Sequence, residues 1–524
     1  MAKSARIHRF FYRNSGFPGV VLLTFTFYIL QVDVKKPGIP SFSNTYDTHP
    51  VSPPTFTFSP LALDIYLKIL SLRFGEALQG LQTLRKQEPH NLLGPFLENY
   101  LDFFYILITD DHAFYRQKRK YKNLRLAQLA RGDRHSPYYL YTQAEIRLQW
   151  AVLQLRYGDY LNGLREVKKG YNLLTENQRR HPGFAANAKS LGILHALLGN
   201  IPGEYQWVIG VLAGMRGTVQ QGLEELASAV AHESPFSAET RTAYAFLLLH
   251  LKNDQTKAWQ QLTTGLPDPR ENPLAAYAMA SMAIRLGRND EAIRLLRECP
   301  DAPSYHPFPY RHYLLGIAKL HRLDSDANQP LETFIQTTKG ENGLKEAFQK
   351  LAWHQLISGN ENGYRHFMQL AKTKGSDRSE PDKAALQEAR SREIPDIRLL
   401  KARLLFDGGY YERAFALLKN AAGAYTGPGK NAVEYAYRMG RIEHASGHWQ
   451  SAAGYYAQTI GAGADQPWHF ACNAALQMGL LYEQQGDFDR ARSAFRRCLQ
   501  LHPETYAATL HARAKAGLER LHGR

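Results

Sequence analysis

The sequence predicts an all-α protein in which helical hairpins stack into a solenoid, and two observations carry that prediction. The first is a glycine followed five positions later by an alanine, which recurs at Gly287/Ala292, Gly409/Ala414, Gly447/Ala452 and Gly486/Ala491. The second is regular spacing, because 38 residues separate the second of these glycines from the third and 39 separate the third from the fourth. A repeat period of roughly 20–50 residues is typical of solenoids.

Length and composition agree with a repeat architecture. A chain of 524 residues exceeds the size of one hydrophobic core. With 44% hydrophobic and 21% charged residues, it has the composition of a folded protein. Because two packed helices cannot bury their apolar face alone, each hairpin has to stack on the next. An ordinary helical bundle remains the alternative, mainly for the middle of the chain.

The last repeat carries the most specific motif. Its elements are Met478-Gly479-x-x-Tyr482, Gly486, Ala491, Phe495 and Pro503. This pattern resembles the tetratricopeptide repeat, in which small residues let neighbouring helices approach while aromatic residues fill the gaps between them. Ala475 stands where the repeat has a tryptophan. The resemblance implies a protein-binding scaffold and brings no catalytic residues with it.

The chain divides into several segments. Four basic residues (Lys3, Arg6, Arg9 and Arg13) precede an apolar run, so residues 1–32 are predicted to be a signal or membrane anchor. The positive-inside rule then places the body outside the cytoplasm, in an extracytoplasmic or periplasmic location. If the run is instead a buried helix, the protein is cytoplasmic. Residues 33–60 are rich in proline and predict an extended tether.

The body is predicted to contain two solenoid sections. Residues 61–371 form an irregular N-terminal section of helices, and residues 396–524 form the C-terminal repeats. Weaker repeat turns in the first section are marked by Gly158, Asn253, Gly287 and Gly359. A polar, charged stretch at residues 372–395 is predicted to be the linker between the two sections.

The segment 199–226 does not fit the repeat. It contains Tyr205, Trp207, Gly214, Gly217, Gly222 and Leu226. This set resembles the glycine-rich insert of tetratricopeptide repeat proteins of the inclusion-body-clearance type and of exported bacterial repeat proteins of unknown role. Its glycines favour a close crossing of helices over a tight turn beside a bound group.

No catalytic, cofactor-binding or metal-ligating constellation is recognised. The sequence lacks H-E-x-x-H and G-x-S-x-G. Gly427-Pro428-Gly429-Lys430 imitates the end of a phosphate-binding loop, but Ala424 and Asn431 stand where the motif requires glycine and serine or threonine. His444 and His448 are four residues apart with Gly447 between them, which disfavours a metal site. The three cysteines, Cys299, Cys472 and Cys498, are predicted to be core residues.

The chain is basic, with a formal net charge of +16. One cluster comprises Arg116, Lys118, Arg119, Lys120, Lys122 and Arg125. Such a cluster suits nucleic acid or an anionic surface, but the aromatic residues are not interleaved with it. A solvated helix face is therefore favoured over a nucleic-acid site, and a membrane surface or an acidic protein is the better partner.

The predicted function is that of a noncatalytic, membrane- or envelope-associated scaffold that binds protein segments in a concave groove. By the resemblance, the first helix of each repeat lines that groove and presents Arg403, Tyr437, Arg441, His444, Asn473 and Gln484. Arg403 and Arg441 each lie six residues before a turn glycine, and two guanidinium groups on one face suit an acidic peptide. The two arginines could instead bridge to Asp407 and Glu434.

Two other functions stay open from the sequence. One is an enzyme whose active site lies in the irregular segment 180–230, and the other is a cytoplasmic basic adaptor that binds an anionic partner. Neither the identity of the partner nor the oligomeric state follows from the sequence.

Overall fold

The structure is a computed structural model that describes residues 54–201, 206–391 and 393–522. Within these ranges the elements are helices, apart from one isolated β-bridge between Thr55 and Asn91, so the predicted all-α fold is confirmed. The predicted signal or anchor, 1–32, and most of the predicted tether lie outside the described residues. None of the helices in the described ranges is both long enough and apolar enough to span a membrane.

The helices form two groups separated by α21. The N-terminal section comprises α3 (Pro60–Leu70), α4 (Phe74–Gln87), α5 (Leu93–Thr109), α6 (His112–Lys118), α7 (Tyr121–Leu129), α8 (Pro137–Arg156), α9 (Tyr160–Arg180), α10 (Ala185–Leu198), α11 (Gln206–Val211), α12 (Val219–Ala231), α13 (Ser237–Leu247), η2 (Leu248–Lys252), α14 (Gln255–Gly265), α15 (Pro273–Arg285), α16 (Asn289–Glu298), α17 (Pro309–Arg322), α18 (Asn328–Thr337), α19 (Leu344–Ile357) and α20 (Glu361–Thr373). After α21 (Glu380–Ser391), the C-terminal section comprises α22 (Ile397–Asp407), α23 (Tyr411–Lys419), η3 (Ala422–Tyr425), α24 (Lys430–Ala445), α25 (Trp449–Gly463), α26 (Phe470–Gln484), α27 (Phe488–Gln500) and α28 (Ala507–Arg520).

The turns inside the hairpins have the backbone that the spacing predicts. The predicted turn glycines all have positive φ, at Gly158 (84°), Gly287 (69°), Gly359 (85°), Gly409 (82°), Gly447 (80°) and Gly486 (78°). Asn253 takes the same conformation with φ of 55°. Glycine and asparagine adopt this left-handed region at the lowest cost, which explains why they end the first helix at these turns. Leu72 after α3 and Leu323 after α17 take the same region with φ of 61° and 65°. The alanines that follow the glycines, such as Ala452 and Ala491, are fully buried.

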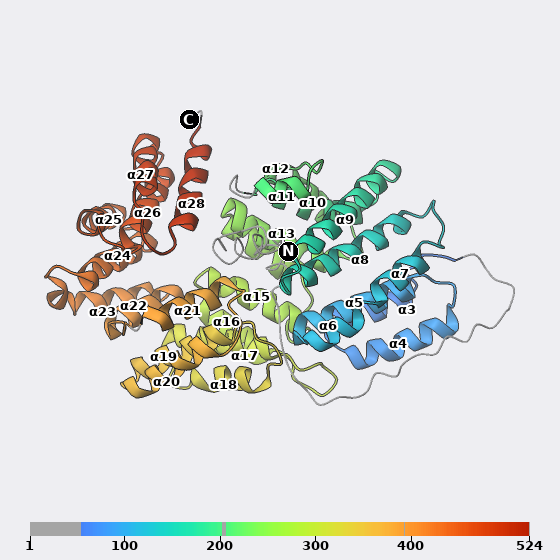
Figure 1. Cartoon of the computed structure of the whole chain (residues 1–524), viewed down its shortest axis with the longest axis horizontal. Coiled ribbons are helices and arrows are strands. Elements are labelled where there is room, and N and C mark those ends of the chain that lie inside the picture. The colour runs from blue at the N-terminus through green and yellow to red at the C-terminus, as the bar shows by residue number, and fades with distance from the viewer. Residues whose placement is uncertain (1–53, 202–205, 392, 523–524) are drawn as a thin grey trace, which may run out of the picture.

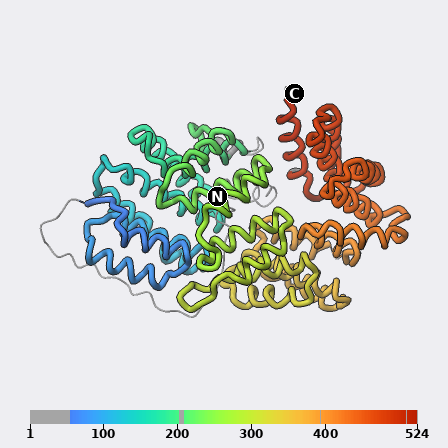
Figure 2. Tube along the Cα trace, turned by 180° about the vertical axis from the view of Figure 1, so that it is seen from behind, coloured from blue at the N-terminus to red at the C-terminus, as the bar shows by residue number. Residues whose placement is uncertain are grey.

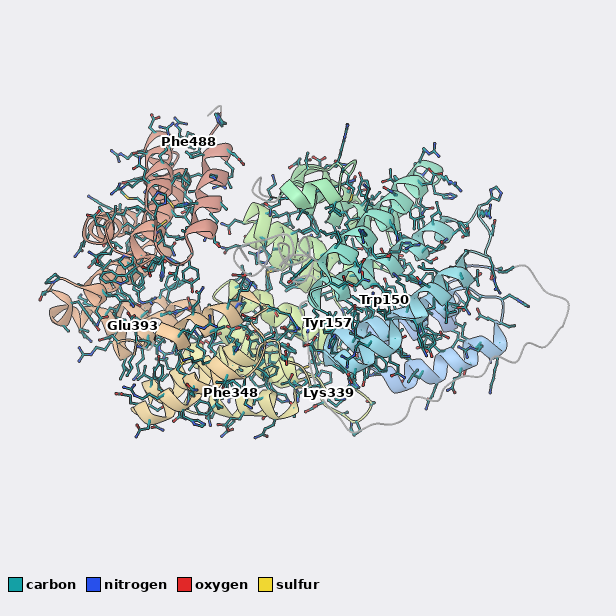
Figure 3. The ribbon with its side chains drawn as sticks, in the orientation of Figure 1. Trp150, Tyr157, Lys339, Phe348, Glu393 and Phe488 are labelled. Atoms are coloured by element: carbon teal, nitrogen blue, oxygen red, sulfur yellow. The ribbon has the colours of Figure 1, made fainter. Side chains whose placement is uncertain are left out.

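The two sections differ in how their cores are organised. One long cluster of buried side chains extends from Phe56 to Ala347 in the N-terminal section, and Trp150 of α8 lies inside it (Figure 3). A smaller cluster from Leu320 to Leu404 joins the end of this section to α22. The C-terminal section instead contains three smaller clusters, each shared by a few consecutive helices. Each helix of the C-terminal section therefore depends for its stability mainly on the helices next to it in the sequence.

The polar stretch 372–395, predicted to be the linker between the two sections, contains a packed helix. This helix, α21, packs against α19 and α20 and buries Asp382, Ala385 and Leu386. Asp382 accepts a hydrogen bond from the backbone N–H of Gly343 (2.8 Å) and so caps the start of α19. The two sections are joined by packed structure, not by a free spacer.

The chain also folds back on itself at this junction. Helix α22 contacts both α17 and α19, and the turn at Gly409 meets the turn at Gly287 so closely that a Cβ on Gly409 would overlap the Gly287 carbonyl oxygen. The Tyr410 hydroxyl donates to Asp290 Oδ1 at 3.0 Å. Figures 1 and 2 show the resulting curved path, along which the C-terminal helices α24 to α28 turn away from the row formed by α16 to α23.

Candidate functional site

The first helices of the C-terminal hairpins make one continuous surface. Helix α22 packs on α24, α24 on α26, and α26 on α28, so these four helices share a side that we call the A-helix face. The residues predicted for the groove all lie on these helices, with Arg403 on α22, with Tyr437, Arg441 and His444 on α24, and with Asn473 and Gln484 on α26.

Arg403 is stacked on an aromatic ring and is still reachable by solvent. Its guanidinium carbon lies 4.7 Å from the centre of the Trp353 ring, and 42% of its side chain is exposed. The Nε atom is 3.8 Å from Asp407 Oδ2, which is longer than a hydrogen bond. Burial opposes the charge, but Asp407 and Glu388 raise the net pKa of Arg403 above its ordinary value. The predicted bridge to Asp407 is thus a weak ion pair between exposed groups.

Arg441 repeats this arrangement one hairpin later. Its guanidinium carbon lies 4.6 Å from the centre of the Phe406 ring, and Nη1 donates to the Tyr437 hydroxyl at 2.9 Å. Burial opposes the charge here too, yet the hydroxyls of Tyr437 and Tyr456 help to raise its pKa. Glu434, the predicted alternative partner, is instead paired with Arg438 on the same helix. Among the described residues, Arg441 has no carboxylate within ion-pair distance.

The remaining predicted residues form smaller groups. His444 Nε2 lies 3.2 Å from Gln484 Oε1, which links α24 to α26. Burial lowers the pKa of His444, so this ring is mainly neutral at pH 7. Asn473 accepts a hydrogen bond from Gln477 at 3.3 Å and stays within its own helix. The structure thus pairs His444 with Gln484 and Arg441 with Tyr437, while Arg403 and Asn473 stand apart.

Helix α28 adds groups that the sequence did not indicate. The Tyr506 ring, 48% exposed, lies 5.0 Å from that of His469 at the start of α26. The side chain of Arg513 on α28 also reaches solvent. The surrounding protein removes part of its hydration, which lowers its pKa, and the charge of Arg441 lowers this pKa further. Because α28 follows Pro503, outside the last repeat motif, the repeat pattern could not place it.

The irregular segment 180–230 packs closely. A Cβ atom on Gly222 of α12 would overlap the backbone of α10 at Ala196 and Gly192, so these glycines allow two helices to cross in contact. This agrees with close packing as the role of the glycines. His195 lies beside this crossing, with Nδ1 2.6 Å from Glu225 Oε2. Tyr205 of the predicted insert lies outside the described residues.

Three of the six residues of the basic cluster form close ion pairs with acids on neighbouring helices. Lys118 lies 2.9 Å from Asp102, Arg125 lies 2.6 Å from the same carboxylate, and Lys122 lies 3.0 Å from Glu166. Both acids are buried, so these cations stabilise the packing of α6 and α7 on the body.

The other weak motifs have structural roles. Lys430 forms an ion pair with Glu393, which is labelled in Figure 3, and the Gly427-to-Lys430 loop joins η3 to α24. His448 pairs with Glu443 at 2.7 Å. In the described part of the chain, no three histidine, cysteine or acidic side chains gather as a metal site. The cysteines are buried as predicted, but Cys472 and Cys498 approach to 3.6 Å between sulfur atoms, which the sequence did not reveal.

Comparison with known families supports the class of protein. Residues 473–516, which run from α26 into α28, match the tetratricopeptide repeat family model. The resemblance predicted from Gly479, Tyr482 and Phe495 is thereby confirmed, and residues 473–516 are similar to a tetratricopeptide repeat. Comparison with curated proteins gives no match.

Two solved structures show similarity to this chain, both at low sequence identity. The similarity to yeast Tom70 has 14% sequence identity and a TM-score of 0.25, and covers 88% of this chain and 82% of Tom70. The similarity to the P58(IPK) TPR domain has 14% identity and a TM-score of 0.20, and covers 78% of this chain and 97% of that domain. At such low TM-scores, neither structure supports an inference about this chain.

Proposed function

We propose that this protein is a noncatalytic scaffold that binds an acidic protein segment on the A-helix face of its C-terminal section. The observation that carries the proposal is the repeated arrangement of Arg403 and Arg441. Each guanidinium group is stacked on an aromatic ring from a preceding helix, and neither has a hydrogen-bonded carboxylate partner among the described residues.

The chemistry of stacked arginine favours this ligand. Stacking covers the flat face of the guanidinium group and holds its plane, while the N–H groups at its edge stay able to donate. A carboxylate accepts two such N–H bonds in parallel, which gives orientation as well as attraction. Arg513 and Tyr506 on α28 add a further cation and an exposed aromatic ring near the same face. An extended segment with spaced acidic residues would match this set.

The test compares acidic-peptide capture by the wild-type chain and by Arg403→Glu/Arg441→Glu. We expect the wild type to retain acidic peptides on an array, with retention falling as salt increases, and the double variant to lose them. The matched control is Arg294→Glu/Arg365→Glu, which makes the same change in charge at two exposed ion pairs of the N-terminal section. Identical peptide profiles from the wild type and the Arg403/Arg441 variant would overturn the proposal.

We further propose that residues 1–32 attach the scaffold to a membrane, with the body outside the cytoplasm. The support is the sequence pattern alone, a basic start followed by an apolar run. The full chain should stay with the membrane fraction through a high-salt wash, whereas a chain that starts at Pro54 should be released. Starting at Pro54 keeps the buried Phe56 and the Thr55–Asn91 bridge. Recovery of both chains in the cytosol would favour the basic adaptor instead.

A further inference from the structure

A cavity of about 510 Å³ lies inside the N-terminal section, far along the chain from the A-helix face. Its wall is built mainly by α3, α5, α8, α10, α13 and α15, the inner helices of successive hairpins. Most of the wall is apolar, with side chains such as Phe103, Phe104, Leu107 and Leu194. Leu67 lines the cavity and is nevertheless 49% exposed, so the cavity reaches solvent beside α3. Volumes of 300–1,000 Å³ are typical of small-molecule sites.

One side of this apolar wall carries a buried ionic cluster. Lys189 Nζ of α10 lies 2.9 Å from Glu145 Oε2 of α8 and 3.3 Å from Glu239 Oε2 of α13. Ser190 donates a hydrogen bond to Glu145, and Tyr66 donates one to Glu239. Glu145, Lys189, Ser190 and Glu239 all line the cavity. Three helices thus bring two carboxylates to a single ammonium group.

The cluster leaves negative charge on the wall. Its two carboxylates carry one more charge than the single ammonium of Lys189. Burial opposes the charge of Lys189, but both carboxylates raise its pKa, so the ammonium stays protonated. The other charged lining residues are two cations, Lys68 and Arg73, and two acids, Asp64 and Glu271, so their charges sum to zero. Lys68 lies 2.8 Å from Asp64. Glu239, with 17% of its side chain exposed, is more accessible than Glu145 at 7%. An incoming anion would face an uncompensated carboxylate, whereas a cation would complete a second ion pair.

We propose that this cavity binds an amphipathic amine, with its apolar body against the leucine and phenylalanine wall and its ammonium group at Glu239. The apolar wall provides affinity through burial, and the excess carboxylate selects the head group. The site is independent of the acidic-segment proposal, because it lies on other helices and prefers the opposite charge.

The probe is dodecylamine, titrated into the full chain by calorimetry below its aggregation concentration, with laurate and dodecanol as comparisons. We expect saturable binding of one dodecylamine per chain, dodecanol binding more weakly, and laurate binding at least about tenfold more weakly than the amine. Laurate equal to or tighter than dodecylamine would overturn the choice of head group. Absence of saturable amine binding would overturn the site itself.

Two variants locate the site. Glu239→Gln keeps the size of the side chain and an acceptor for Tyr66 while removing the charge, so the preference for amine over laurate should fall about tenfold. Glu233→Gln, an exposed change shortly before α13, is the matched control and should bind like the wild type. Ala238→Phe places a ring in the cavity and should abolish binding of dodecylamine and dodecanol alike.

Circular dichroism and the acidic-peptide array show whether these variants stay folded. Each variant should keep the wild-type helical signal and the wild-type peptide profile, because the A-helix face is untouched. An unchanged preference in Glu239→Gln would show that the charge of this residue does not select the ligand, and the proposal would fall. Loss of peptide capture in the Arg403/Arg441 variant with amine binding preserved would confirm that the two sites are separate.

Discussion

The two sections solve the same packing problem in different ways. In the C-terminal section, each turn glycine is followed by a buried alanine, and small local clusters hold neighbouring hairpins together. In the N-terminal section, one cluster joins distant helices, and ionic groups such as Lys189 and Asp102 are buried within it. Buried charges are costly, and both of these groups lie within ion-pair distance of opposite charges: Lys189 beside Glu145 and Glu239, and Asp102 beside Lys118 and Arg125. The regular section therefore owes its stability to repetition, and the irregular section to specific long-range contacts.

This contrast bears on where ligands bind. The regular hairpins present exposed side chains on the A-helix face, which suits an extended segment. The inner helices of the irregular hairpins line a cavity of about 510 Å³ that reaches solvent beside α3. The cavity therefore lies in the section that departs from the regular repeat, and the following changes test how far the two sections differ.

The largest effect is expected for Lys189→Met. Removing the ammonium leaves the buried carboxylate of Glu145 and the partly buried one of Glu239 without a cation, which costs about 3–5 kcal/mol of local stability. Hydrogen exchange measured by mass spectrometry should show faster exchange in α8, α10 and α13 and unchanged exchange in α24 to α27. The control is Lys68→Met at the mouth of the cavity, whose partly exposed pair with Asp64 contributes under about 1 kcal/mol. Wild-type protection of α10 in Lys189→Met would contradict the structural role of this cluster.

Ala491→Asp should give the next largest effect, and it should stay local. Ala491 is fully buried at the contact of α26 with α27, so a carboxylate there lacks both space and a partner and costs about 3 kcal/mol. Exchange should accelerate in α26 to α28 and not in the N-terminal section. Asp489→Ala, at a side chain that is 93% exposed, is the control and should change nothing measurable. Faster exchange throughout the chain would mean that the C-terminal section is not a local unit.

The turn glycines were predictable from the sequence because a local backbone requirement fixes them. Only residues that tolerate positive φ can end these helices, so spacing alone located Gly409, Gly447 and Gly486. The buried alanines five residues after these glycines were located by the same spacing. The same register predicted that the six candidate residues lie on the first helices of the hairpins, which is where the structure places them. It did not predict which side chains they contact.

Long-range contacts were beyond the sequence pattern. Glu145, Lys189 and Glu239 are separated by 44 and 50 residues, and no periodicity connects them. The meeting of Gly287 with Gly409 likewise depends on α22 folding back on α17. Two signals were present and missed. Glu434 and Arg438 are four residues apart on one helix, which favours that pair over Glu434 with Arg441. Ala385, Leu386 and Ala389 have the spacing of a buried helix face within the supposed linker.

A comparison of two glycines sharpens the contrast between the sections. Gly222→Ala places a Cβ against the backbone of α10, which cannot move aside, and should cost about 1–3 kcal/mol. Gly454→Ala, in the middle of α25 with open space around it, should instead stabilise its helix by up to about 1 kcal/mol. Thermal melting monitored by circular dichroism gives the sign of each change. A stabilised Gly222→Ala chain would show that the crossing of α10 and α12 is looser than described.

The smallest effect is expected from the protonation of His444 on the A-helix face. Burial and the charge of Arg441 lower the pKa of this ring in the folded chain, whereas Gln484 opposes the shift. The folded state then favours the neutral ring, so this contribution to stability is present above the ordinary histidine pKa of about 6.5 and is lost as the pH falls below it. His444→Gln cannot be protonated, and it keeps an amide able to bond to Gln484. The difference in melting temperature between wild type and His444→Gln should therefore shift in favour of the variant between pH 7.5 and pH 5. His366→Gln, at an exposed histidine on α20, is the control for replacing a histidine whose side chain is in solvent. If the difference in melting temperature between wild type and His444→Gln stays constant across this pH range, then burial and the charge of Arg441 do not lower the pKa of His444. The ring of His444 would then be electrostatically independent of Arg441 on the A-helix face.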